Sequence, residues 1–157
     1  MNIIQGDLIQ LAKEGHFDVI AHGCNCFLTM GKGIALQIKM EFPEAFQEDQ
    51  KTSRGDLWKL GTYSFAHILR YNLTVINAYT QFDYRPTYND DGIVRCDYDA
   101  IRRVFKAIAR DFGNDARIGY PKIGAGLAGG DWEIISKIID EELIDHNHTL
   151  VEFQPYS

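Results

Sequence analysis

The strongest constraint on this sequence is the alternation of short β-branched runs with segments of helical spacing. Residues 19–22 and 73–79 are apolar or β-branched and are typical of buried strands, whereas residues 97–112 carry apolar side chains three and four positions apart. Strands separated by helices are joined by crossovers, which place helices on both faces of a parallel or mixed sheet. The sequence therefore predicts an α/β fold with a mostly parallel central sheet.

The remaining elements follow the same alternation. We expect strands at 2–4, 19–22, 62–68, 73–79, 116–120 and 149–153. We expect helices at 8–13, 33–42, 43–51 and 97–112, and a last helix that Asp131 caps. Residues 81–91 are polar with aromatics and one proline, which is typical of an exposed loop over a pocket. Because ligands bind such sheets beyond the carboxyl ends of the strands, the loops that follow the strands are the candidate site.

The first glycine-rich loop joins a strand to a helix and has the sequence HGCNCFLTMGKGIA from His22 to Ala35. Gly31 and Gly33 allow the backbone to approach a ligand closely. The helix start presents unpaired N–H groups and the positive end of the helix dipole, so an anion is favoured there. A plain turn at the start of a helix is the alternative interpretation of this glycine pair.

The second glycine-rich loop has four glycines within the seven residues from Gly124 to Gly130. Such a cluster indicates backbone with positive φ or a close approach to a ligand. Like the first loop it lies between a strand and a helix, so two loops at one sheet edge could hold a diphosphate from opposite sides. The spacing of neither loop is that of a Walker loop or a Rossmann fingerprint, so we expect a different phosphate-binding arrangement.

Charge restricts the class of partner. The chain has 22 acidic residues against 16 lysines and arginines, a formal net charge of −6, and no stretch gathers several basic residues. Proteins that follow a nucleic-acid backbone need a basic surface, so broad nucleic-acid binding is not expected. A single nucleotide is compatible with this charge, because backbone amides can hold its phosphates.

Length and cysteine usage indicate one soluble domain spanning residues 1–157. The three cysteines, Cys24, Cys26 and Cys96, do not form a disulfide framework. The first residues lack the basic region and apolar stretch of a signal peptide, and no apolar run is long enough to cross a bilayer. We expect a cytoplasmic monomer with no membrane partner.

Four motifs, in this order along the chain, resemble those of the macro domain family: Gly6-Asp7-Leu8, His22-Gly23-Cys24-Asn25, Met30 to Ala35, and Pro121 to Leu127. The resemblance covers nearly the whole chain, and the ordered set is specific although each motif is short. Its His-x-Cys-Asn and Gly-x-Gly-Ile-Ala motifs are similar to those of ADP-ribose 1″-phosphate phosphatases and de-ADP-ribosylating hydrolases. The resemblance implies a three-layer α/β/α fold with a mixed, mostly parallel sheet, and ADP-ribose or its 1″-phosphate as ligand.

The resemblance also implies roles for individual residues. Asp7 would accept a hydrogen bond from the adenine amino group beside the Leu8 amide, and the same carboxylate can cap a helix. Asn25 would contact the distal ribose, unless it only forms a turn. Gln81 lies near the same rim, and Phe82 or Tyr84 could cover a ring. The other residues expected to enclose the ligand are Gly23, Cys24, Met30, Gly31, Lys32, Gly33, Ile34, Ala35, Thr80, Gly124, Ala125, Gly126, Leu127, Ala128, Gly129 and Gly130.

His22 and Asn25 are the candidate catalytic residues. His22 lies beside a glycine loop, and an imidazole with its ordinary pKa of about 6.5 can act as a general base toward water. The alternative is a structural histidine at the end of a strand. No group of histidines, cysteines and carboxylates has metal-ligand spacing, so we expect a reaction without a metal or other cofactor.

One departure from the family pattern bears on the reaction. Glycohydrolase members use a lysine of the middle loop, which forms a covalent adduct, and an aspartate after Gly-Leu. Here Ala128 follows Gly126-Leu127, and residues 77–91 contain no lysine. The sequence therefore favours hydrolysis of the terminal phosphate of ADP-ribose 1″-phosphate by activated water. Two alternatives stay open: a non-catalytic ADP-ribose reader, and a hydrolase that removes ADP-ribose from modified protein or nucleic acid.

Overall fold

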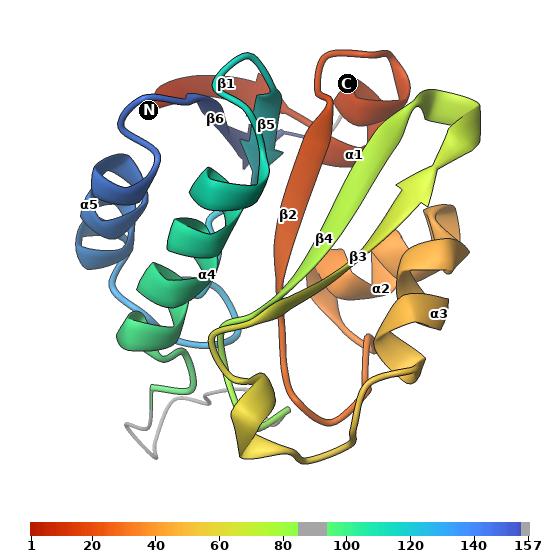
Figure 1. Ribbon diagram of the computed structural model, residues 1–157, viewed down its shortest axis with the longest axis vertical. Coiled ribbons are helices and arrows are strands. Elements are labelled where there is room, and N and C mark those ends of the chain that lie inside the picture. Colours follow the sequence, from red (N-terminus) through yellow and green to blue (C-terminus); the bar gives the residue numbers. More distant parts are fainter. Residues whose placement is uncertain (85–93, 155–157) are drawn as a thin grey trace.

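The computed structural model describes residues 1–84 and 94–154, and within these ranges six strands form one sheet (Figure 1). The strands are β1 (Asn2–Gly6), β2 (Val19–Cys24), β3 (Tyr63–Ile68), β4 (Leu73–Tyr79), β5 (Arg117–Tyr120) and β6 (Asn147–Phe153). Their order across the sheet is β1-β6-β5-β2-β4-β3. All neighbours are parallel except β3, which pairs antiparallel with β4. The mixed, mostly parallel sheet that we expected is confirmed.

Helices cover both faces of the sheet, which makes three layers (Figure 1). The α-helices are α1 (Leu8–Lys13), α2 (Gly33–Glu41), α3 (Pro43–Gln50), α4 (Tyr98–Asp111) and α5 (Trp132–Glu142). Helices α4 and α5 pack on one face, and α1, α2 and α3 on the other. Two short 3-10 turns, η1 (Leu57–Lys59) and η2 (Leu69–Tyr71), were not expected from the sequence. None of the helices within the described residues is long and apolar enough to span a membrane.

The two faces of β2 belong to different apolar cores. Val19 and Ala21 pack in the core under α4 and α5, whereas Ile20 packs in the core under α1, α2 and α3. Because side chains alternate along a strand, His22 lies on the same face as Ile20. The direction of this histidine is therefore fixed by the register of the strand.

Three strands are longer than their sequence pattern indicated, and the first of them is β1, which was expected at 2–4 and continues to Gly6. We expected β2 to end at His22, but its ladder with β4 continues through Gly23 and Cys24, which pair with Ala78 and Tyr79. Strand β6 begins at Asn147 rather than at residue 149, because Asn147 pairs with Arg117 of β5. Helix α1 and strand β4 have the bounds that we expected. Of the expected loop at 81–91, residues 85–91 lie outside the described residues.

Candidate functional site

The two glycine-rich loops lie on either side of one cavity. They follow β2 and β5, which are parallel neighbours in the sheet, so both leave the sheet at the same edge. The cavity has a volume of about 490 Å³. Its lining residues are Gly23, Cys24, Asn25, Thr29, Gly31, Lys32, Gly33, Ile34, Ala35, Gln81, Tyr84, Pro121, Lys122, Ile123, Gly124, Gly126, Leu127 and Ala128.

The first loop brings the open start of α2 to the cavity. The N-cap residue, Lys32, makes no side-chain hydrogen bond to the helix start. Within the described residues, the backbone amides of Gly33, Ile34 and Ala35 donate to no protein acceptor. Gly33 has a φ of 58°, a left-handed conformation that favours glycine. Three unpaired amides at the positive end of a helix are suited to an anion.

The second loop presents amides in a different way. Helix α5 is capped by Asp131, whose carboxylate accepts from the Glu133 amide, so the start of this helix is not open to an anion. The loop is closed on itself instead, with the Gly130 amide donating to the Gly124 carbonyl at 2.7 Å. In the part of the chain that the structure describes, the amides of Gly126, Leu127 and Ala128 donate to no protein acceptor. This side of the cavity therefore offers loop amides rather than a helix terminus.

The glycines of these loops have two separate functions. A Cβ at Gly130 would lie 2.4 Å from the Cys96 sulfur and 2.6 Å from the Gly124 carbonyl oxygen, so this glycine is required for packing. A Cβ at Gly31 or Gly126 would meet nothing within 4 Å, and both residues line the cavity. At these two positions the absence of a side chain keeps the cavity open.

Asn25 lies in the wall of the cavity, and its side chain holds the first loop. Its amide nitrogen donates to the Thr29 hydroxyl at 2.7 Å and to the Thr29 carbonyl at 3.1 Å. Its amide oxygen accepts from the Phe27 backbone amide at 2.8 Å. Asn25 thus forms the turn that we named as its alternative role, at a position from which it can also contact a ligand.

His22 is not among the residues that line the cavity, which corrects the placement that we expected. It has no exposed surface, and its Nε2 atom lies 2.7 Å from the Asn77 side-chain oxygen. The Asn77 amide nitrogen donates to the Ala45 carbonyl and to the Ser64 hydroxyl, so the Asn77 oxygen accepts and His22 Nε2 carries the proton. Burial lowers the pKa of His22 to about 4, against the opposing effect of the Asn77 hydrogen bond. The imidazole is therefore neutral at pH 7 and lies under α3 because of the strand register.

The described lining residues include no acid–base pair. Among the described lining residues there is no histidine, aspartate or glutamate. Cys24 is buried, and burial raises the pKa of its thiol well above the ordinary value, so it stays protonated at neutral pH. Within the same described ranges, no group of three or more histidines, cysteines and carboxylates could hold a metal ion. The described lining residues offer backbone amides, two lysines, the neutral polar side chains of Asn25, Thr29 and Gln81, the Tyr84 ring and small apolar side chains.

The structure brings together twelve of the predicted site residues and leaves eight outside the lining. The eight are Asp7, Leu8, His22, Met30, Thr80, Ala125, Gly129 and Gly130. Met30 and Thr80 are buried beneath the loops, and the Thr80 hydroxyl oxygen has no hydrogen-bond partner among residues 1–84 and 94–154. Thr29, Pro121, Lys122 and Ile123 line the cavity but were not among the predicted residues. The sequence feature that could have identified these four residues is their position, because each lies within or directly before a glycine-rich loop.

Asp7 and Leu8 lie at the same sheet edge, after β1. The Asp7 carboxylate caps α1 by accepting from the Gln10 amide at 3.1 Å through one oxygen. Leu8 is buried in the core. Phe153, which the sequence analysis did not single out, pairs with Gly6 in the sheet and has 69% of its surface exposed. An exposed ring is thus carried by the residue opposite Gly6, one position before Asp7 in the chain, and among the described residues only one Asp7 carboxylate oxygen accepts a hydrogen bond.

Two curated relatives have about the length of this chain, and a third is a longer protein that contains a similar segment. An uncharacterized 17.5 kDa protein of Enterobacteria phage T4 is 34% identical over 97% of this chain and 96% of its own length. An ADP-ribose 1″-phosphate phosphatase of Candida albicans is 28% identical over 88% of this chain and 90% of its own length. A DNA ADP-ribosyl glycohydrolase of Mycobacterium tuberculosis is 29% identical over 84% of this chain, which spans 35% of that protein.

Solved structures agree on the fold. A protein of unknown function from Bacteroides thetaiotaomicron has a TM-score of 0.76 and 29% identity, and the match covers 97% of this chain and 98% of that one. The macrodomain of Mycobacterium tuberculosis DarG has a TM-score of 0.73 and 22% identity, covering 99% of this chain and 97% of that one. The model of the Macro domain family matches residues 21–139, more than half of the chain. The chain therefore belongs to the macro domain family.

Proposed function

We propose that this chain binds ADP-ribose and its 1″-phosphate in the cavity between the two glycine-rich loops. The observation that carries the proposal is a set of six backbone amides of lining residues that have no acceptor among the described residues, three from the start of α2 and three from Gly126, Leu127 and Ala128. Two opposed sets of N–H donors fit the two phosphates of a diphosphate, and they do so without a basic surface. Relatives named for acting on ADP-ribose and its 1″-phosphate support the choice of ligand.

The order of the strands supports one direction for the bound ligand. Across the sheet edge, Asp7 follows β1, the second glycine loop follows β5, the first follows β2, and Tyr84 comes after β4. An adenine held by Asp7 and the exposed Phe153 ring would lie at one end, with the diphosphate between the loops. The distal ribose and its 1″ substituent then lie toward Asn25 and Tyr84.

We further propose that the bound 1″-phosphate is hydrolysed. A water oxygen attacks phosphorus, the bond between phosphorus and the ribose 1″ oxygen breaks, and that oxygen takes a proton, which releases phosphate and ADP-ribose. Without a carboxylate or imidazole in the described lining, catalysis would depend on positioning and on stabilisation of phosphate charge by amides and Lys32. Such a reaction should be slow, and His22 should not contribute to it.

The second candidate function is a non-catalytic reader of ADP-ribose. It is favoured by one specific observation, the absence of any histidine or carboxylate from the described lining residues. A reader needs only the amides and the ring contacts, all of which are compatible with this lining.

A phosphorus NMR time course with ADP-ribose 1″-phosphate separates these functions. Growth of free phosphate, with turnover unchanged in His22→Gln and reduced in Asn25→Ala, is the expected result. Shifted and broadened diphosphate signals without free phosphate would establish a reader or a hydrolase of another 1″ linkage. Diphosphate signals that the protein leaves unperturbed would refute the ligand assignment.

A further inference from the structure

Three polar side chains form a row at the sheet edge between β1 and the second glycine-rich loop. Gln5 of β1 pairs with Glu152 of β6 in their parallel ladder. The ladder of β5 with β6 reaches the pair of Tyr120 and Leu150. Lys122 follows Tyr120 by two residues, which is the position level with Glu152. The register of three neighbouring strands therefore places Gln5, Glu152 and Lys122 at one level.

Glu152 is held by both of its neighbours in this row. Gln5 Nε2 donates to Glu152 Oε2 at 3.4 Å, and Lys122 Nζ lies 3.6 Å from Glu152 Oε1. The side chains of Lys122 and Glu152 are 49% and 35% exposed, so the ion pair is open to solvent. Because a carboxylate oxygen has more than one lone pair, each can accept a ligand hydroxyl in addition to its present partner.

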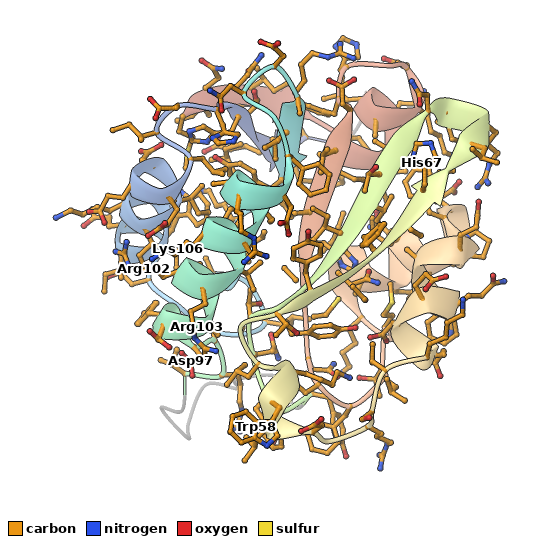
Figure 2. The ribbon with its side chains drawn as sticks, viewed as in Figure 1. Trp58, His67, Asp97, Arg102, Arg103 and Lys106 are labelled. Atoms are coloured by element: carbon orange, nitrogen blue, oxygen red, sulfur yellow. The ribbon has the colours of Figure 1, made fainter. Side chains whose placement is uncertain are left out.

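Lys122 brings this row to the cavity. It lines the cavity together with Lys32, and the described lining residues include no other lysine or arginine. Lys122 directly precedes the second glycine-rich loop, whereas Lys32 belongs to the first. Figure 2 shows three further basic side chains, Arg102, Arg103 and Lys106, on α4, and none of them is a lining residue. Among the described lining residues, Lys122 is therefore the cation on the β5 side.

The row lies where the bound ligand would cross the sheet edge. In the proposed direction, adenine lies near Asp7 after β1, and the diphosphate lies between the loops that follow β5 and β2. Strand β6, which carries Glu152 near its end, stands between β1 and β5. The adenosine ribose joins adenine to the diphosphate, so it would pass over the end of β6 and beside Glu152.

We propose that Glu152 is a specificity-determining residue, which accepts a hydrogen bond from the 2′ hydroxyl of the adenosine ribose and excludes ligands that carry a phosphate there. The inference rests on the proposed function, which sets the direction of the ligand. A carboxylate suits a ribose hydroxyl, whereas a phosphate at the same position needs a cation. Lys122 does not serve as that cation, because it is already paired with Glu152. Gln5 and Lys122 are positioning residues that hold the carboxylate in place.

The substrate class that follows is ADP-ribose and its 1″ derivatives with an unmodified adenosine ribose. Such compounds arise from a dinucleotide whose adenosine ribose has free hydroxyls. Derivatives of a 2′-phosphorylated dinucleotide would bring a second negative group beside the Glu152 carboxylate, and like charges that close repel each other. The site would thus distinguish two classes of ligand that are identical at their 1″ ends.

Two ligands that differ only at the adenosine ribose test this assignment. Calorimetry compares ADP-ribose with the same compound phosphorylated on the 2′ hydroxyl of its adenosine ribose. We expect the wild-type protein to bind ADP-ribose roughly thirtyfold more tightly than the 2′-phosphate. Glu152→Gln removes the charge and keeps the shape of the side chain. In this variant the ratio should fall to about one, because Lys122 becomes free to pair with the phosphate.

Matched variants separate this role from a general effect of charge. Glu48 is also paired with a lysine, Lys51, and has a similar exposure of 38%, but it lies on α3 and is not a lining residue. Glu48→Gln should keep the wild-type ratio. In the Glu152→Gln background, Lys122→Met should raise the ratio again, since the 2′-phosphate then loses its cation. Lys106→Met in that background should not raise it.

A ligand without the 2′ hydroxyl gives a second readout. The wild-type protein should bind ADP-ribose about fivefold more tightly than the analogue with 2′-deoxyadenosine, and Glu152→Ala should bind the two equally. A general loss of folded protein would not change this ratio, because both ligands bind the same sample. Equal binding of the two by the wild-type protein would overturn the hydrogen bond to the hydroxyl.

The remaining outcomes separate this inference from the proposed function. Equal affinity of the wild-type protein for ADP-ribose and its 2′-phosphate, with ADP-ribose bound tightly, would overturn the role of Glu152 and leave the proposed function intact. A wild-type ratio that persists in Glu152→Gln would assign the discrimination to another group and would also overturn that role. Failure of ADP-ribose itself to bind would refute the proposed function and this inference with it.

Discussion

The cavity and the buried network under α3 are both rich in polar groups, but in the cavity these belong to the backbone and in the network to side chains. Six cavity amides lack a protein acceptor among the described residues. The network joins His22, Asn77, Ser64, Tyr79 and Asp49 through hydrogen bonds of 2.7 to 3.0 Å. The cavity is therefore equipped to bind a ligand, whereas the network satisfies its own groups and stabilises the fold.

The comparison also separates what the sequence position of His22 indicates from what its place in the structure shows. Next to a glycine-rich loop in sequence, His22 has the position of a general base. In the structure it belongs to the buried network, because strand alternation turns it toward α3 and away from the loop. Residues adjacent in sequence point into the same site only where the backbone has left the strand, because within a strand successive side chains lie on opposite faces of the sheet.

The largest expected effect comes from filling the cavity. Gly126→Val and Gly31→Val place a side chain where the fold has open space, so the melting temperature should change little. Affinity for ADP-ribose should fall by roughly a hundredfold or more, about 3 kcal/mol, because the side chain blocks the amides. Calorimetric titration measures this loss. Gly113→Val, also in open space but outside the lining, is the control and should bind normally.

The pH dependence of stability tests the buried histidine. The folded state holds the pKa of His22 at about 4, below its value of 6.5 when unfolded, so protonation favours the unfolded chain. The stability conferred by the neutral imidazole is fully present above pH 6.5 and is lost as the pH falls toward 4. Between pH 7 and 4, the free energy of unfolding should drop by about 3 kcal/mol more than in His22→Gln, measured by urea denaturation. Parallel pH profiles for the two proteins would contradict the assignment.

A somewhat smaller effect should come from opening the network at Tyr79. The Tyr79 hydroxyl lies 2.7 Å from Asp49 and 2.8 Å from Ser64, and Asp49 is 1% exposed. Tyr79→Phe leaves a buried carboxyl without its donor and should cost about 2 kcal/mol of stability. Thermal unfolding measures the loss. ADP-ribose affinity at low temperature should be unchanged, and a large drop in affinity would show that the two regions are coupled.

The smallest effect distinguishes the two roles of Asp7. Serine caps helices as well as aspartate does, so Asp7→Ser should leave the stability of the fold nearly unchanged. It removes the second carboxylate oxygen, and ADP-ribose should bind about tenfold more weakly. Ribose 5-phosphate, which has no adenine, is the matched ligand whose affinity should not change. Equal binding of ADP-ribose by both proteins would restrict Asp7 to capping.

The alternation of strands and helices determined the class of fold. Residues 73–79 and 8–13 were predicted with the bounds that the structure has, because local propensity and pairing agree there. Strand β2 was predicted too short, since Gly23 indicates a break on propensity alone and only the ladder with β4 keeps it in the sheet. The 3-10 turns lack a strong sequence pattern because they are short.

For the site, too, some features were predicted from the sequence and others were decided only by the tertiary structure. The glycine spacing by itself located both loops of the cavity, because glycine is chosen where the backbone must bend or approach a ligand. Only the tertiary structure decided that α5 is closed by Asp131, that His22 faces α3, and that Phe27, Phe82 and Tyr84 meet. These facts depend on strand register and on contacts between segments distant in sequence. Local sequence patterns do not encode such contacts, because each is fixed by how the whole chain packs.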